Sequence, residues 1–333
     1  MKKPKDDWGN YEIVFNKNYK RGKFNLATQP ALLTHRGGWK NVLAAMKPLH
    51  NENGVRCETF IECPFDWFRN INIKNKSIPI TEPWVGFIHN PHNMPSWYDN
   101  PNSVRVEDDE HFKFSLNYCK GIFAMSEYHT QGLKSFFPKY SHLFESILHP
   151  YSDEDFTEWQ GDNIVLSVGW WLRKQTSIYK VALPKGYRRM KLYPYKKDGE
   201  PYKLVRSKLE TEAKRFNVKL EGIEERYQLD NSQYDELLNR SIVLMDVFDT
   251  SANNTVLECI QRAVPILVPR HPSIIEYLGA DYPLYFDKLD DVQYLIPYAD
   301  SAVSHMKKII KSEKLSLKSF ISNIRKSKIY KQL

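Results

Sequence analysis

The 333-residue sequence contains no run of roughly 18 apolar residues, so it predicts no transmembrane helix. The charged N-terminal stretch MKKPKDDWGNYEIVF is not followed by an apolar segment, which argues against a secretory signal peptide. There are only four cysteines, and no pair has the Cys-x-x-Cys spacing of common zinc and redox sites. We therefore expect free thiols in a reducing compartment and a cytoplasmic protein.

The sequence also lacks a basic surplus outside its C-terminal segment. The formal net charge is +8, but residues 301–333 carry nine Lys or Arg and one acid, which leaves 39 basic and 39 acidic residues in the first 300. Nucleic-acid-binding proteins usually spread positive charge over a working face, so nucleic acid is not an expected partner. Apolar residues recur in 301–333 at near-helical spacing. We expect a helix that packs by its apolar face, with a peripheral membrane contact as the alternative.

The sequence does contain a regular alternation of strand-like and helix-like segments. Strand-like runs such as WVGFIHNP (84–91) and NVKLEG (217–222) are separated by amphipathic segments. This order predicts parallel sheets with helical crossovers. The alternation restarts once, so we expect two doubly wound α/β domains, at 1–150 and 151–299, followed by the basic segment 300–333. Ligands of such sheets bind at the carboxyl ends of the strands, and a cleft between the two domains is the expected active site.

A loop of small polar residues joins the strand-like run SIVLMDVFD to the helix-like segment NTVLECIQRA. The first N–H groups of a helix lack an intrahelical partner and lie at the positive end of its dipole, so they attract phosphate. Glu258, one turn into the helix, is placed to accept hydrogen bonds from ribose hydroxyls. The alternative is a capping box, in which Thr255 and Glu258 serve only the helix end. The loop residues expected to bind phosphate are Thr250, Ser251, Asn253, Asn254 and Thr255.

The segment LECIQRAVPILVPRHPSIIEYLG (257–279) resembles the GT-B-fold glycosyltransferases that carry a Glu-x7-Glu region. Glu258 matches the second Glu, and Ala263-Val264-Pro265 matches the turn into the next strand. The first Glu is missing, since Thr250 stands eight residues before Glu258, with Asp249 beside it. The resemblance implies two Rossmann-like domains that face a cleft, and a C-terminal helix that crosses back to the N-terminal domain.

The same resemblance implies further donor-site residues. Gly37 and Gly38 match a glycine turn that faces the cleft. In NIVLSVGWWLRKQ, which matches the first donor-domain strand, Arg173 and Lys174 are the cations that can reach a diphosphate, although the family places its Arg directly after the Gly. The implied activity transfers a hexose from a UDP- or GDP-linked sugar to a hydroxyl of a glycan or lipid-linked acceptor. No metal or other cofactor is expected, because helix amides and cations can stabilise the leaving diphosphate.

Candidate catalytic residues follow the strand-like run WVGFI. His89 and His92 stand at its carboxyl end, where the family often has a histidine that contacts the donor sugar. An inverting transferase needs a general base for the acceptor hydroxyl, and histidine suits that role. Asp249, beside the position of the missing Glu, is the third candidate. Two alternatives remain for the histidines: an HxxH metal site or an ordinary surface loop.

Other functions stay open at this stage. A GT-B nucleotide-sugar epimerase needs no acceptor site. A non-catalytic carbohydrate- or nucleic-acid-binding protein on the same fold explains the missing Glu, and a DNA glycosyltransferase would use the basic segment on phosphates. The sequence does not distinguish the nucleotide, the sugar, the acceptor, the oligomeric state, or a retaining from an inverting course.

Overall fold

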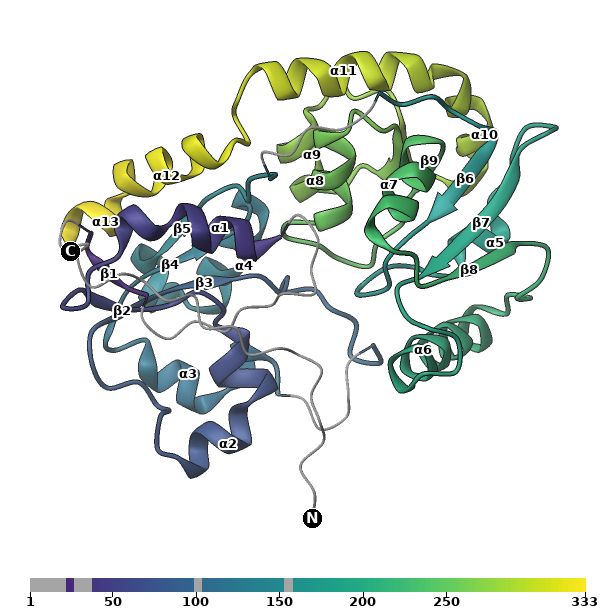
Figure 1. Cartoon of the computed structure of the whole chain (residues 1–333). Helices are drawn as coiled ribbons and strands as arrows, with labels where there is room; N and C mark the ends of the chain where they lie inside the picture. The colour runs from purple at the N-terminus through teal and green to yellow at the C-terminus, as the bar shows by residue number, and fades with distance from the viewer. Residues whose placement is uncertain (1–21, 27–37, 99–103, 153–157) are drawn as a thin grey trace. The chain divides into compact units, whose positions relative to one another are not determined.

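Two parallel β-sheets organise the chain (Figure 1). The computed structural model describes residues 22–26, 38–98, 104–152 and 158–333. Contacts divide the chain into two units, which are described separately below. Unit 1 comprises Met1–His92, Asp99–Asp153 and Leu315–Leu333, and unit 2 comprises Asn93–Tyr98 and Glu154–Lys314. The segment Asn93–Tyr98 thus groups with unit 2, although it lies inside the predicted N-terminal domain.

Unit 1 contains a five-stranded parallel sheet with the order β1-β2-β3-β4-β5. All five residues of β3 are buried, as expected for a central parallel strand whose two faces are covered. The strands are β1 (Phe24–Asn25), β2 (Val55–Glu58), β3 (Trp84–Ile88), β4 (Cys119–Ala124) and β5 (Phe144–Ser146). The helical segments between them are α1 (Trp39–Ala45), η1 (Lys47–Leu49), η2 (Cys63–Trp67), α2 (Arg69–Lys74), η3 (Val106–Asp108), α3 (Glu110–Ser115), α4 (Glu127–Phe136) and η4 (Pro138–Leu143).

Two helices of unit 1, α3 and α4, begin at a side-chain cap. The Asp109 side chain accepts a hydrogen bond from the backbone of Phe112 at the start of α3, and Ser126 does the same for His129 at the start of α4. The core combines aliphatic and aromatic side chains, and within it Phe112 packs edge-on against Phe65 at 5.2 Å between ring centroids.

Residues 300–333 form three helices, not the single helix that the sequence predicted. These are α11 (Ala299–Lys311), α12 (Leu317–Lys326) and α13 (Lys328–Gln332). Glu313 has a left-handed backbone after α11, and serines cap the two later helices. In unit 2, α11 packs on α8, and in unit 1, α12 packs on α1 and α13 on β4. The apolar stripe is buried at Met306, Phe320 and Ile324, which favours the packing interpretation over a membrane contact.

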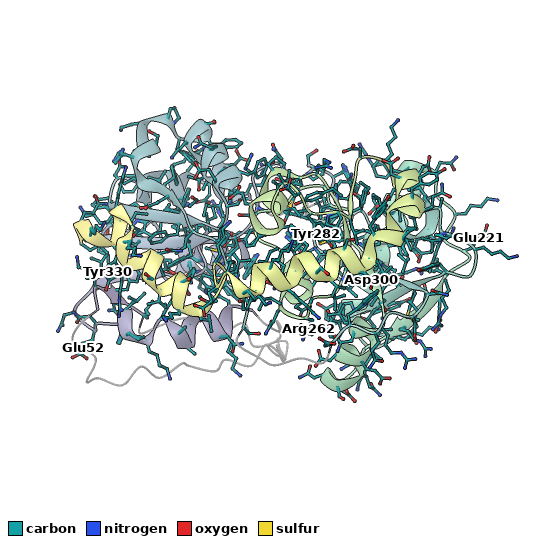
Figure 2. All side chains as sticks on the ribbon, turned by 90° about the horizontal axis from the view of Figure 1, so that it is seen from above. Glu52, Glu221, Arg262, Tyr282, Asp300 and Tyr330 are labelled. Carbon is teal, nitrogen blue, oxygen red and sulfur yellow. The ribbon has the colours of Figure 1, made fainter. Side chains whose placement is uncertain are left out.

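A glycine and an aromatic pair fix α13 on unit 1. Gly121 in β4 lies so close to Ile329 that a Cβ there would come within 2.4 Å of the Ile329 side chain. The ring of Tyr330, labelled in Figure 2, meets Phe24 of β1 edge-on at 5.0 Å. The Glu145 carboxylate accepts the backbone N–H of Lys328 and of Ile329. The C-terminal residues are thus an integral part of unit 1.

Unit 2 contains a six-stranded parallel sheet with the order β11-β10-β9-β6-β7-β8. The chain first builds β6 to β8 outward, then crosses to the other side of β6 and builds β9 to β11. This is the doubly wound order, with its switch point between β6 and β9. The strands are β6 (Ile164–Ser167), β7 (Arg188–Tyr193), β8 (Glu224–Tyr227), β9 (Ile242–Leu244), β10 (Ile266–Pro269) and β11 (Tyr285–Phe286). The other helical segments are α5 (Ser177–Lys180), α6 (Glu200–Phe216), α7 (Asn231–Asn239), α8 (Asn254–Gln261), α9 (Pro272–Leu278), η5 (Leu289–Asp291), α10 (Val292–Leu295) and η6 (Ile296–Tyr298).

One predicted strand of unit 2 is wrong. The segment 217–222 is not a strand, because Asn217 takes a left-handed conformation that ends α6 and Gly222 also has positive φ. The strand follows at β8, in which three of the four residues are charged and none is fully buried. Among the described residues, no helix combines the length and the apolar character needed to cross a bilayer.

Candidate functional site

The switch point of unit 2 brings together the loops that follow β6 and β9. An antiparallel bridge joins Arg173 to Val247, and the backbone N–H of Lys174 donates to the carbonyl of Asp246 at 2.9 Å. The Lys174 ammonium also pairs with the Asp246 carboxylate at 3.1 Å, and Ser177 donates to the other Asp246 oxygen at 2.8 Å. Lys174 is therefore a cation that already has a counter-ion.

Arg173 is different, because its partners are neutral. Its Nη2 donates to Asn253 Oδ1 at 3.1 Å and to Thr255 Oγ1 at 2.8 Å, and its other nitrogens donate to backbone carbonyls. Within the described part of the chain it forms no salt bridge with a carboxylate. Burial lowers the pKa of the guanidinium, but an arginine keeps its charge in proteins. A partly buried cation at a helix N-terminus, without a counter-ion, is suited to hold an anion.

The α8 N-terminus is capped by Asn253, whose Oδ1 accepts from the Thr255 backbone N–H at 3.0 Å. Thr255 is thus already inside the helix, and its hydroxyl accepts from Arg173. Glu258 Oε2 accepts a 2.7 Å hydrogen bond from the hydroxyl of Tyr234 on α7. The capping box between Thr255 and Glu258 is therefore wrong as an explanation of these two residues.

Asp249 holds three elements of unit 2 together. One carboxylate oxygen accepts from the backbone N–H of Asn93 at 2.7 Å. The other accepts from the Thr250 N–H at 2.8 Å and lies 3.0 Å from His271 Nε2. His271 caps α9 after the next strand, β10, and the sequence interpretation missed it. Because Asp249 is buried and both its oxygens have protein partners, this geometry favours a positioning role over direct catalysis.

The other residues predicted to bind phosphate belong partly to unit 2 and partly to unit 1. Thr250 and Ser251 are buried in the loop before α8, and Asn254 is the first residue of that helix. Gly38 lies in unit 1 as the N-cap of α1, and Gly37 lies outside the described residues. Within unit 2, Arg173 therefore contacts Asn253 and Thr255 at the end of this loop, and Gly38 belongs to the other unit.

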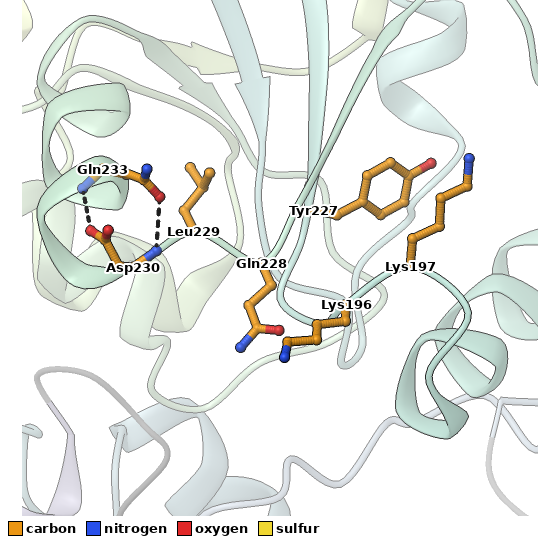
Figure 3. A pocket seen from close by; sticks show the side chains of 7 residues that line it. All are labelled: Lys196, Lys197, Tyr227, Gln228, Leu229, Asp230 and Gln233. Atoms are coloured by element: carbon orange, nitrogen blue, oxygen red, sulfur yellow. Dashed lines mark hydrogen bonds between the residues drawn. The ribbon is translucent and has the colours of Figure 1, made fainter.

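A pocket of about 470 Å³ opens along the same sheet edge, beyond the carboxyl ends of β7 and β8 (Figure 3). Tyr227 stacks on Tyr193 at 5.4 Å, and Lys197 lies 5.4 Å from the Tyr227 ring centroid. The pocket reaches the N-terminus of α7, the helix that carries Tyr234. Its lining residues are Lys196, Lys197, Tyr227, Gln228, Leu229, Asp230 and Gln233.

In unit 1, His89 follows β3 at the carboxyl edge of the sheet. Its ring stacks on Phe60 at 3.8 Å and meets Trp39 edge-on at 4.5 Å. Its Nδ1 lies 3.5 Å from Glu62 Oε2, and the other Glu62 oxygen accepts the backbone N–H groups of His89 and Asn90 at 2.6 Å each. The two aromatic rings and the Glu62 carboxylate thus fix the orientation of the His89 imidazole.

Glu62 is fully buried and was missed by the sequence interpretation, although it follows the strand in CETFIEC. Burial raises the pKa of the Glu62 carboxyl group. The interaction with the His89 side chain and the hydrogen bond from the Asn90 N–H lower this pKa by more than burial raises it. The net pKa is lowered, so the carboxylate stays charged at neutral pH. The nearby His149 is also buried, and burial lowers its pKa to about 4.

His92 lies in different surroundings from His89. Its ring packs against Tyr128 of α4 at 4.8 Å, and Gly132 leaves the space that the imidazole fills. Both histidines are largely buried, so the surface-loop alternative is wrong. Among the described residues, no three His, Cys, Asp or Glu side chains are grouped to hold a metal, and the HxxH metal site finds no support.

Known structures share this architecture. A UDP-forming α,α-trehalose-phosphate synthase from Burkholderia xenovorans matches with a TM-score of 0.52 at 12% identity, over 85% of this chain and 76% of that chain. HepE from Anabaena, in complex with UDP and glucose, matches with a TM-score of 0.52 at 9% identity, over 73% and 71%. The pneumococcal O-GlcNAc transferase GtfA, in complex with UDP and GlcNAc, matches with a TM-score of 0.52 at 11% identity, over 86% and 58%.

The chain has the GT-B fold. The predicted α/β architecture of two Rossmann-like units is confirmed. No protein-family model matches the sequence, and no curated protein matches it either. At these identities the structural likeness shows the fold, and the function has to be argued from the residues.

Proposed function

We propose that the protein is a glycosyltransferase that moves a hexose from a nucleotide-diphosphate sugar to an acceptor hydroxyl. One observation carries the proposal: Arg173 has neutral partners and lies against the N-terminus of α8, at the switch point of a doubly wound sheet. Ligands of this fold class bind at that point. The UDP in the HepE and GtfA structures supports a nucleotide diphosphate as the anion.

The donor is accommodated along the carboxyl edge of the unit 2 sheet. Arg173, with Lys174 beside it, and the first amides of α8 stabilise the negative charge that develops on the leaving diphosphate, in place of a divalent cation. Glu258 accepts from the ribose, and the Tyr234 hydroxyl fixes its carboxylate. The pocket next to Tyr227 receives the base. A uracil or guanine fits the proposal equally, and we give UDP priority because the matched structures contain it.

The acceptor side uses His89 as general base, with Glu62 as the residue that positions it. The Glu62 carboxylate faces Nδ1, which favours a proton on that nitrogen and leaves Nε2 free to take the proton of an attacking hydroxyl. A base of this kind supports inversion at the anomeric carbon. We propose a cytoplasmic location, which fits four free, buried cysteines.

Nucleotide binding tests the donor site directly. UDP, GDP, ADP, CMP and dTDP are compared by thermal unfolding, with and without EDTA. A nucleotide at about 100 times its dissociation constant should stabilise the protein by roughly 2.7 kcal/mol, and EDTA should leave the shift unchanged. The Glu258→Ala variant should lose most of the shift. Glu236→Ala, which removes an exposed carboxylate from α7, is the matched control and should keep it.

Product analysis during turnover then distinguishes a transferase from an epimerase. A transferase releases free nucleotide diphosphate only as fast as it glycosylates an acceptor or water, whereas an epimerase changes the sugar without releasing the nucleotide. Proton NMR of the glycoside distinguishes inversion from retention. If no nucleotide stabilises the wild-type protein, the donor-site proposal fails and a non-catalytic binding protein becomes the better explanation.

A further inference from the structure

The pocket beyond β7 and β8 has an aromatic wall that is fixed in place (Figure 3). The Tyr227 hydroxyl donates to one oxygen of Glu225, and the other oxygen accepts from Arg206 at 3.1 Å. The Tyr227 ring stacks on Tyr193 with only 9° between the two ring planes. Because its hydroxyl proton is already engaged, Tyr227 offers a ligand ring surface and no hydrogen-bond donor.

Two lining residues at the start of α7 are bound to each other. Asp230 Oδ1 accepts the backbone N–H of Gln233 at 2.9 Å, and Gln233 Oε1 accepts that of Asp230 at 3.2 Å. This capping box, dashed in Figure 3, holds both side chains against the backbone of α7. One acceptor atom of each side chain is therefore committed to the helix, and one Asp230 oxygen remains for a ligand.

The other polar groups of the pocket are mostly donors. Lys196 and Lys197 are exposed and form no ion pair among the described residues. Lys197 is placed over the ring of Tyr227, with its Nζ 5.4 Å from the ring centroid. An ammonium group carries three donors and no acceptor, whereas the amide of Gln228 can do either. The pocket is therefore suited to a planar ligand that presents a carbonyl oxygen to the two lysines.

The place of the pocket along the sheet decides which part of a nucleotide meets these lysines. Arg173 follows β6 at the switch point, and the order β9-β6-β7-β8 puts the loops after β7 and β8 successively farther out. A nucleotide with its diphosphate at Arg173 extends outward along this edge, so the end of the base farthest from the ribose reaches the pocket. That end carries a carbonyl oxygen in uracil, thymine and guanine, and an amino group in cytosine and adenine.

We infer that Lys196 and Lys197 select the nucleotide by the carbonyl group of its base. The inference rests on the proposed function, because it names the nucleotide class that the same donor site accepts. A uracil, thymine or guanine accepts from the ammonium groups, and its adjacent ring N–H donates to Gln228 or to the remaining oxygen of Asp230. Cytosine and adenine turn an amino group toward the ammonium groups, so donor meets donor and the charge-assisted hydrogen bond is lost.

UDP and CDP are the sharpest pair of probes, because they share the ribose and the diphosphate and differ only at this edge of the base. Isothermal titration calorimetry on the full-length protein should show UDP binding about tenfold or more tightly than CDP, as a charge-assisted hydrogen bond predicts. GDP should exceed ADP in the same sense. Lys196→Met combined with Lys197→Met should weaken UDP, leave CDP nearly unchanged and bring their dissociation constants within about threefold of each other.

Lys185→Met is the matched control. Lys185 is exposed just before β7, at the opposite end of the strand that the two lysines follow, so its loss should leave the ratio of dissociation constants unchanged. Arg173→Met should weaken UDP and CDP equally, because it acts on the diphosphate that both share.

The inference is overturned if the wild-type protein binds UDP no more tightly than CDP. It is also overturned if the double lysine variant keeps the wild-type ratio, since an equal loss for both nucleotides would mean that the lysines hold phosphate. Failure of every nucleotide to bind would instead remove the proposed function.

Discussion

The two units present opposite chemistry at the same structural position. In unit 2, the carboxyl edge of the sheet carries a cation with neutral partners, a helix N-terminus and small polar side chains. In unit 1, the corresponding edge carries aromatic rings around a histidine that faces a buried carboxylate. A parallel sheet collects loops at that edge in both cases, and the loop residues decide what binds there.

Under the proposed function, this difference suits unit 2 to the donor and unit 1 to the acceptor. An anion is stabilised by Arg173 and by helix amides, which are pre-oriented and need no proton exchange. A neutral hydroxyl is activated by a base whose tautomer is held by a partner, as Glu62 holds His89. The comparison yields predictions that should affect one unit and spare the other.

Arg173→Met should have the largest effect. Charge-assisted hydrogen bonds to a phosphate are worth about 1.5–3 kcal/mol, and a loss of about 2.7 kcal/mol raises a dissociation constant about 100-fold. We expect UDP binding, measured by isothermal titration calorimetry, to weaken by that factor. Amide hydrogen exchange in the unit 1 sheet should be unchanged, because the substitution alters no residue of that unit.

Arg188→Met is the control for the loss of an arginine. Arg188 is exposed at the start of β7 and pairs with Glu224, away from the carboxyl edge. Its replacement should change the UDP dissociation constant by less than twofold. Equal weakening by both substitutions would show that general positive charge, and not the Arg173 geometry, drives binding.

Lys191→Met should stabilise unit 2 by about 1–2 kcal/mol at pH 7. Lys191 is 1% exposed, and in the described residues its Nζ has no hydrogen-bond partner. Burial lowers its pKa to about 8, against about 10.4 in an unfolded chain. Between these values the unfolded state binds more protons, so stability of the wild-type protein rises with pH across that window. Thermal unfolding at pH 7 and 9 should show the rise in the wild type and not in the variant.

Unit 2 also shows where the sequence was informative. The apolar run before Asp249 and the amphipathic segment after Asn253 predicted β9, α8 and the loop between them, because each carries a clear hydrophobic pattern. β7 begins with two arginines and β8 reads EERY, so neither shows that pattern. Their strand conformation is set by pairing with β6 and with each other, which a single sequence does not display.

Some site residues could likewise be found from the sequence, and others only from the structure. Glu258 could be selected because the loop and helix beside it had recognisable chemistry, and Arg173 because NIVLSVGWWLRKQ resembles a donor-domain strand of the GT-B glycosyltransferases. Glu62 and His271 could not, since their importance depends on partners 27 and 22 residues away, at His89 and Asp249. His92 carried the same local signal as His89, and only the packing of α4 separates the two.

Glu62→Gln should lower kcat about tenfold and leave KM nearly unchanged. The amide keeps an oxygen for the N–H groups of His89 and Asn90, so the loop geometry is retained. Its NH2 group then faces His89 Nδ1, which removes the preference for a proton on that nitrogen and so for the productive tautomer. The ¹⁵N chemical shifts of His89 report that tautomer directly. A purely structural role for Glu62 would be indicated if the His89 tautomer were unchanged and KM rose about tenfold, as much as kcat is expected to fall.

The smallest expected effect is an acid sensitivity confined to unit 1. His149 has a pKa of about 4 in the folded protein because it is buried, against about 6.5 when unfolded, so the unfolded state takes up the extra proton as pH falls from 6.5. This costs about 1 kcal/mol at pH 6 and more below it. Glu62 has a lowered pKa, so its contribution is present above about pH 4.3 and is lost only at lower pH. Amide hydrogen exchange at pH 7.5 and 6, corrected for intrinsic rates, should show weaker protection in β3 and β5 but not in β6 and β9. Equal losses in both sheets would mean that His149 does not set the acid stability of unit 1.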